Sequence, residues 1–255
     1  EQAHSSFFAI PAEADEAHAP IHRLLVACKA YDAAPALARL APRLAVGAEL
    51  ILLQNGLGSQ DEVADQVPHA RCIFASSTEG AFRPADWQVQ FAGHGFNWLG
   101  DPLNPAPAEW FSDLEGAGIP AQWTLDILSR LWRKLALNCA INPLTVLHDC
   151  QNGGLLEHLS EVDALCAELA QLLHCCGQPQ AAEGLNEEVQ RVILATAANY
   201  SSMYQDVRHG RRTELHYLLG YACRAAHRHG LALVELEHLR QRLVDNLQAR
   251  GLPSD

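Results

Sequence analysis

The chain has 255 residues, 49% of them hydrophobic, which is enough to fill the core of one large domain or two modest ones. Eighteen Lys and Arg against thirty Asp and Glu leave a formal net charge of -12, so we expect no binding to nucleic acid or to an anionic membrane surface. No apolar run approaches the roughly 20 residues that a bilayer span requires.

The N-terminus and the cysteines indicate a reducing compartment. The first 20 residues, EQAHSSFFAIPAEADEAHAP, lack the basic start and apolar centre of a secretory signal, so we expect a cytoplasmic protein. The eight cysteines form no C-x-x-C pair and no His/Cys cluster with zinc-finger spacing. Only His174, Cys175 and Cys176 invite a metal reading, and because neighbouring side chains diverge, we expect no metal.

The first 110 residues alternate short apolar runs with helical stretches. In chain order they read HRLLVACKAYD, DAAPALARLAPRL, AELILLQNGLG, a second helical stretch and ARCIFASSTEG. Strand, helix, strand, helix, strand is typical of a parallel α/β sheet. The next run, WQVQFAGHGFNWLGD, alternates apolar and polar residues around glycine and predicts an antiparallel pair added to that sheet.

From about residue 117 the pattern changes to amphipathic helices. The periodicity predicts helices over 121–141, 159–176, 186–209, 212–230 and 234–249. We therefore expect an α/β domain over residues 1–116 and an all-α domain over residues 117–255.

Three hydrogen-bonding side chains recur at steps of four in the apolar run LWRKLALNCAINPL. Lys134, Asn138 and Asn142 share one face of a helix, and each needs a partner if it is buried. A solvated helix face is the simpler interpretation. Two features favour a ligand: Asn is a weak helix former, and Pro143 predicts a helix end followed by a loop that carries Asn152.

A second polar cluster lies in NYSSMYQDVRHGRRTELHY. Asn199 and Ser202 lie three residues apart on one predicted helix face, and Glu214 follows an interruption at Gly210. A carboxylate near an amine would keep Lys134 charged, while Ser and Asn suit an anionic ligand. A capped helix junction explains the same residues equally well.

These motifs resemble the ketopantoate reductase (2-dehydropantoate 2-reductase) family. The resemblance rests on WRKLALNCAINPLT, the NGG turn, NYSSMYQDVRHGRRTELHYLLGY, LLVACKAYDAAPAL and ILLQNGLGSQDEVA, and spans about residues 20 to 249. It implies an incomplete Rossmann-type coenzyme domain followed by a helical domain of the 6-phosphogluconate dehydrogenase-like type. It also implies a monomer or homodimer that reduces a small 2-keto acid, ketopantoate, to pantoate with NADPH in pantothenate and coenzyme A biosynthesis.

The resemblance also assigns roles to the polar residues. It makes Lys134 the general acid and Glu214 the carboxylate that positions the lysine and the substrate. The substrate would contact Asn138, Asn142, Asn152, Asn199 and Ser202. The coenzyme would contact Lys29, through its phosphate or in the cleft, and Asn55 with Gly56, where the backbone can approach the nicotinamide.

The chain departs from the family pattern in one respect. It contains no G-x-G-x-x-G, begins at Glu1 and lacks the expected first βαβ unit. It is either a fragment, or a wrongly assigned start, of a longer enzyme, which we favour, or a shortened relative that has lost coenzyme binding. Two other functions stay open: a related 2-keto or 3-hydroxy acid dehydrogenase, and a non-catalytic remnant that binds a carboxylate. The choice between NADPH and NADH is not encoded in these residues.

Overall fold

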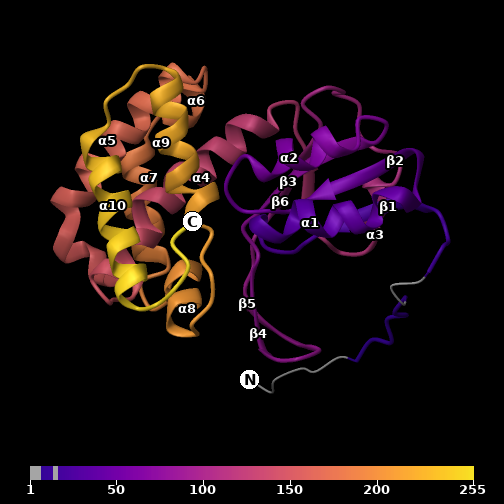
Figure 1. The fold of residues 1–255 in the computed structure, drawn as a ribbon, viewed down its shortest axis with the longest axis horizontal. Helices are drawn as coiled ribbons and strands as arrows, with labels where there is room; N and C mark the ends of the chain where they lie inside the picture. Colours follow the sequence, from indigo (N-terminus) through magenta and orange to yellow (C-terminus); the bar gives the residue numbers. More distant parts are fainter. Residues whose placement is uncertain (1–6, 14–16) are drawn as a thin grey trace.

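A computed structural model describes residues 7–13 and 17–255 of the chain. Residues 1–6 and 14–16, which belong to the predicted first domain, lie outside the described residues. A sheet-containing half and a helical half lie side by side, as Figure 1 shows. This arrangement agrees with the predicted order of an α/β domain followed by an all-α domain.

The sheet half is built around five strands in the order β1-β2-β3-β6-β7. The strands are β1 Ile21–Val26, β2 Leu44–Leu52, β3 Arg71–Ser77, β6 Asn97–Gly100 and β7 Ala121–Trp123. The first three run parallel and are joined by α1 Ala30–Leu40, η1 Ala41–Arg43 and α2 Ser59–Gln66. The predicted alternation of strand and helix is therefore confirmed.

The predicted antiparallel pair is wrong in one of its strands. β6 does join the sheet, antiparallel to β3, and α3 Phe111–Gly116 leads from it towards β7. β5 Gln88–Gly93 instead pairs with β4 Gly80–Ala85 in a separate two-stranded ribbon. Between β5 and β6, Gly95 passes close to the Thr78 backbone, because an added Cβ at Gly95 would lie 2.2 Å from it. This close crossing separates β5 from β6.

The helical half surrounds one central helix, α4 Ile127–Leu147, which packs against α5, α7, α8 and α10 and against β3. The other elements are η2 Asn152–His158, α5 Leu159–Cys175, α6 Pro179–Ala182, α7 Leu185–Ala195, α8 Ser202–Arg208, η3 Leu215–Tyr217, α9 Leu219–Arg228 and α10 Val234–Ala249. In the part of the chain that the structure describes, no helix is long and apolar enough to span a membrane.

The ends of α4 differ from the prediction. The helix begins at Ile127, where the Asp126 carboxylate accepts a hydrogen bond from the Ser129 backbone N–H (3.1 Å), and it continues past Pro143 to Leu147. Proline inside a helix costs about 3 kcal/mol. Every residue from Cys139 to Val146 is buried, so packing of this segment offsets that cost.

Two of the predicted helices, 186–209 and 212–230, are each divided into two shorter elements. The 186–209 prediction covers α7 and α8, which residues 196–201 separate, and the 212–230 prediction covers η3 and α9. The sheet extends to Trp123 and α4 begins at Ile127, so we propose that the domain boundary lies between these two residues rather than at residue 117.

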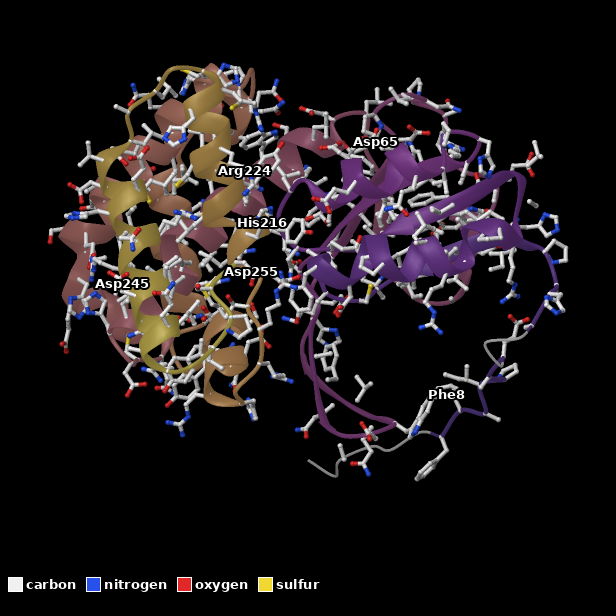
Figure 2. The ribbon with its side chains drawn as sticks, in the orientation of Figure 1. Phe8, Asp65, His216, Arg224, Asp245 and Asp255 are labelled. Carbon is white, nitrogen blue, oxygen red and sulfur yellow. The ribbon has the colours of Figure 1, made fainter. Side chains whose placement is uncertain are left out.

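The loop after β2 forms a close contact between the two halves. The Leu57 backbone N–H donates to the Tyr217 carbonyl (2.9 Å), and the Tyr217 hydroxyl donates to Glu62 Oε2 (3.0 Å). Figure 2 shows His216 and Arg224 on the side of the helical half that faces the sheet half. Gly56 has φ +78°, and a Cβ there would lie 2.2 Å from the Tyr217 carbonyl oxygen. Only glycine fits this contact.

We expect Gly56→Ala to destabilise the protein by about 3 kcal/mol or more, because it adds a backbone clash to an unfavourable positive φ. Gly47→Ala is the matched control, since Gly47 has φ +75° but no atom within 4 Å of an added Cβ, and should cost only about 1 kcal/mol. Urea unfolding measures both. Equal losses of stability would contradict the close contact with Tyr217.

Candidate functional site

The lysine of the polar stripe reaches from the helical half to the sheet. Lys134 on α4 donates a hydrogen bond from Nζ to the backbone carbonyl of Ser77, the last residue of β3 (2.8 Å). β1, β2 and β3 are parallel, so their carboxyl ends lie at the same edge of the sheet. Ligands of open α/β sheets bind at that edge. The ammonium group therefore lies where such a ligand would bind.

The environment of Lys134 makes it a better acid. Burial lowers the pKa of its ammonium group, because desolvation disfavours the charged form. The charge of Glu214 acts in the opposite direction, but the pKa stays below its ordinary value. A lysine with a lowered pKa gives up its proton more readily near neutral pH.

The two asparagines of the stripe lie on the same helix with unused amides. Asn142 is buried and Asn138 is partly exposed. Within residues 7–13 and 17–255, neither side-chain amide has a hydrogen-bond partner. Neither amide is among the fully buried side-chain atoms that lack a partner in the described residues, so both keep contact with solvent. Both amides are therefore available to a ligand.

The loop residue Asn152 is tied to the turn that carries Asn199. Asn152 Nδ2 donates to Thr196 Oγ1 (2.8 Å), and its backbone N–H donates to the Asn199 carbonyl (2.9 Å). The Asn152 Oδ1 atom is buried without a partner among the described residues. Asn199 itself is exposed. These contacts fix η2 against residues 196–199.

The serine that caps α8 is Ser201, not the predicted site residue Ser202. Ser201 Oγ accepts from the Tyr204 backbone N–H (3.1 Å) and hydrogen bonds to Thr145 Oγ1 (2.7 Å), which in turn donates to the Asn142 carbonyl (2.7 Å). This chain of hydrogen bonds holds the start of α8 against the α4 turn that carries Asn142. It leaves Ser202 exposed on the first turn of α8.

Glu214 lies between the two halves in what we call the Lys29 charge cluster, made of Lys29, Asp206 and Glu214. Glu214 Oε1 accepts from the backbone N–H of Ala30 at the start of α1 (3.0 Å), and its Oε2 lies 3.6 Å from Lys29 Nζ. Lys29 Nζ also donates to Asp206 Oδ2 (2.6 Å). Both carboxylate side chains are only 6% exposed. Asp206 Oδ1 also lies 3.3 Å from Arg211 Nε, so Lys29 and Arg211 together balance the two nearly buried charges.

Sequence reasoning assigns Lys29 and Gly56 to the coenzyme and overlooks Asp206. The structure places Lys29 against the two carboxylates, and it fills the space beside Gly56 with the Tyr217 backbone. Asn55, which lies three residues after the end of β2, stays partly exposed. One signal could have identified Asp206: it is a lone carboxylate between Met203, Tyr204 and Val207, all of which are buried.

We expect Lys29→Met to destabilise the protein by about 1–2 kcal/mol at pH 7. Glu214 loses the Lys29 cation and Asp206 keeps only Arg211, while solvent screens the 35% exposed lysine side chain. Arg23→Met is the control, because Arg23 is 59% exposed and 3.9 Å from Glu49, and should change stability by less than about 0.5 kcal/mol.

The pH dependence of the Lys29 effect has a definite sign. Burial lowers the pKa of Lys29, but Glu214 and Asp206 more than offset it, so the folded-state pKa lies above the ordinary 10.5. The contribution is therefore complete below pH 10.5 and is lost as the pH rises through the folded-state pKa. Urea unfolding at several pH values measures it. A Lys29→Met protein as stable as wild type at pH 7 would contradict the cluster's role.

Comparisons with known proteins identify the family of the chain. The family described as "Ketopantoate reductase PanE/ApbA" matches residues 3–104, and "Ketopantoate reductase PanE/ApbA C terminal" matches residues 126–244. The 2-dehydropantoate 2-reductase of Vibrio cholerae is 37% identical over 214 residues, which cover 82% of this chain and 72% of that protein.

Solved structures show the same fold. The 2-dehydropantoate 2-reductase of Methylococcus capsulatus aligns with a TM-score of 0.79 at 26% identity, covering 92% of this chain and 77% of that chain. D-mandelate dehydrogenase with NADH and anilino(oxo)acetate aligns with a TM-score of 0.83 over 94% of this chain and 80% of that chain, but at 19% identity it supports the fold alone. On the sequence matches that cover both halves, the chain belongs to the ketopantoate reductase family.

Proposed function

We propose that the protein is an oxidoreductase that reduces 2-dehydropantoate to pantoate with a reduced nicotinamide coenzyme. One observation carries the proposal: the Lys134 ammonium, with its lowered pKa, lies at the carboxyl end of β3, on the same helix stripe as the unpartnered amides of Asn138 and Asn142. The relatives named 2-dehydropantoate 2-reductase support the choice of keto acid.

Reduction of a ketone requires a hydride at carbon and a proton at oxygen. When bound, the nicotinamide coenzyme supplies the hydride. Lys134 Nζ donates the proton to the carbonyl oxygen, which becomes the hydroxyl. Because negative charge develops on that oxygen, the ammonium stabilises the transition state more than the neutral ketone. The Asn138 and Asn142 amides orient the substrate, and Glu214 helps to keep the lysine protonated.

The substrate carboxylate would bind at the junction of η2 and α8. The Ser202 hydroxyl and the Asn199 amide are the hydrogen-bond donors there, and both suit an anionic ligand. Asn152 Nδ2 already donates one N–H to Thr196 and has one further N–H to offer. The Ser201 and Thr145 hydroxyls support this binding indirectly, because they hold α8 against α4. Substrate recognition thus uses the second polar cluster, while proton transfer uses the α4 stripe.

The residues present fit the nicotinamide side of a coenzyme. Asn55 follows β2 at the edge where the parallel strands end, and within the described residues its side-chain amide has no partner. Lys29 is neutralised by Asp206 and Glu214 and is less suited to a phosphate than the sequence alone implies. We propose NADPH on the strength of the family resemblance, and titration with NADPH and NADH in parallel tests that choice.

A related 2-keto acid dehydrogenase is the second candidate, because proton donation by Lys134 suits the carbonyl oxygen of any 2-keto acid. Turnover of ketopantoate and of other 2-keto acids should therefore be compared on the same preparation. The assay should use this chain and, separately, the chain with any upstream residues of the same reading frame. Turnover of another acid with none of ketopantoate would favour the second candidate, and turnover of no acid by either protein would overturn both.

We expect Lys134→Ala to lower kcat by a factor of about 10²–10⁴, the range for loss of a general acid. Arg130→Ala is the control: Arg130 lies one turn earlier on α4, and its guanidinium lies over the Trp98 ring (4.8 Å), so its loss should leave kcat close to wild type. Coenzyme oxidation with ketopantoate is the measurement. A folded Lys134→Ala protein with wild-type kcat would show that another group supplies the proton.

We expect Lys134→Met to raise the stability at pH 7 by about 1 kcal/mol, because it removes an ammonium whose burial is unfavourable. The sign follows from the lowered pKa of Lys134: between that folded-state pKa and 10.5 the unfolded chain binds more protons, so wild-type stability rises with pH. The advantage of Lys134→Met should therefore shrink as the pH approaches 10.5. Thermal unfolding at several pH values measures it. A destabilised Lys134→Met at pH 7 would contradict this account.

A further inference from the structure

Three potential metal ligands come together at the far end of α4. His148 follows the last residue of α4, His158 ends η2, and Glu161 lies in the first turn of α5. One ligand atom from each lies within 4.8 Å of the others. All three residues are partly exposed, so ions can reach them from solvent.

The geometry of the three side chains is close to that of a coordination shell. His148 Nε2 lies 2.9 Å from Glu161 Oε2, and the His148 and His158 rings lie 3.6 Å apart between centroids, with an angle of 14° between their planes. Ligand atoms around a tetrahedral zinc ion lie about 3.4 Å apart. A small opening of the His–Glu pair would therefore admit an ion.

One ring must turn to complete the shell. Two nearly parallel rings cannot both direct a nitrogen lone pair at a common point, so either His148 or His158 has to rotate. His158 is free to do so, because within the described part of the chain its ring has no hydrogen-bond partner. Glu161 is already oriented, since Arg242 Nη1 donates to its other oxygen, as outer-shell groups do around metal ligands.

We propose that His148, His158 and Glu161 bind a divalent transition metal ion, with water in the fourth position. Two imidazoles and a carboxylate are a donor set that zinc, cobalt and nickel accept. The bound ion would join α4 to α5 across the segment that contains η2 and Asn152. The sequence gives no sign of it, because the H-x9-H-x2-E spacing matches no common zinc motif and the turn between the helices brings the ligands together.

The test is calorimetric titration of the full 255-residue chain with ZnCl2, after treatment with EDTA. We expect one saturable equivalent and a higher melting temperature with zinc. His148→Ala and His158→Ala should each weaken binding at least about tenfold. His227→Ala is the matched control. His227 forms a similar pair with Glu237 (2.8 Å), but within the described residues this pair belongs to no three-ligand cluster. The His227→Ala protein should therefore bind zinc as tightly as wild type does.

Cobalt identifies the ligand type. With nitrogen and oxygen ligands, bound Co²⁺ should show visible d–d bands without the intense near-ultraviolet absorption of a thiolate, which excludes the eight free cysteines as ligands. Absence of saturable zinc binding would overturn the proposal. So would unchanged affinity in both His148→Ala and His158→Ala, or thiolate absorption with cobalt.

Discussion

The position of one ammonium group constrains much of this structure. Lys134 must belong to the central helix of the helical half and still reach the carboxyl end of β3, where its Nζ meets the Ser77 carbonyl. That requirement explains why α4 packs against both the other helices and the sheet. It also explains why the lysine is poorly solvated: a site at the junction of two cores excludes water, and the excluded water is what lowers the pKa.

The charges around this junction are divided between the halves. Lys29 comes from the sheet half and Glu214 from the helical half, while Asp206 contacts both Lys29 and its neighbour Arg211 in the helical half, so separating the halves would part Lys29 from both carboxylates. Glu214 has a double role, since it accepts from the first N–H of α1 and acts on Lys134 through its charge. The contact that holds the halves together and the charge that adjusts the pKa of Lys134 thus come from the same side chain.

Local periodicity in the sequence was sufficient to predict part of this structure. The alternation of β1, α1, β2, α2 and β3 follows from apolar runs and turn signals, and the spacing of Lys134, Asn138 and Asn142 follows from helical geometry. The structure brings Lys134 and Glu214 close enough for the charge of one to affect the pKa of the other. The catalytic and binding roles of these residues rest on the family resemblance and stay predictions.

Tertiary packing determines the features that the sequence did not predict. α4 passes Pro143 because its neighbours are buried, which a local rule for proline cannot anticipate. β5 leaves the sheet at a glycine crossing with Thr78, and Gly56 is needed for contact with Tyr217 more than 150 residues away in sequence. Asp206 and the His148, His158 and Glu161 group have no sequence motif, because only the folded chain brings their partners together.

The same long sequence separations affect how the protein acquires its site. Lys29 and Asp206 are 177 residues apart in the chain, and Ala30 and Glu214 are 184 apart. Contacts of this kind close very long loops, and the entropic cost of closing a loop is incurred before the contact adds stability. We therefore expect these contacts to form late in folding. Helices such as α5 and α10 can form from local interactions well before the two halves dock. During refolding, helical circular dichroism should therefore recover before the environment of Lys134 does, and the site is among the last features of the molecule to exist.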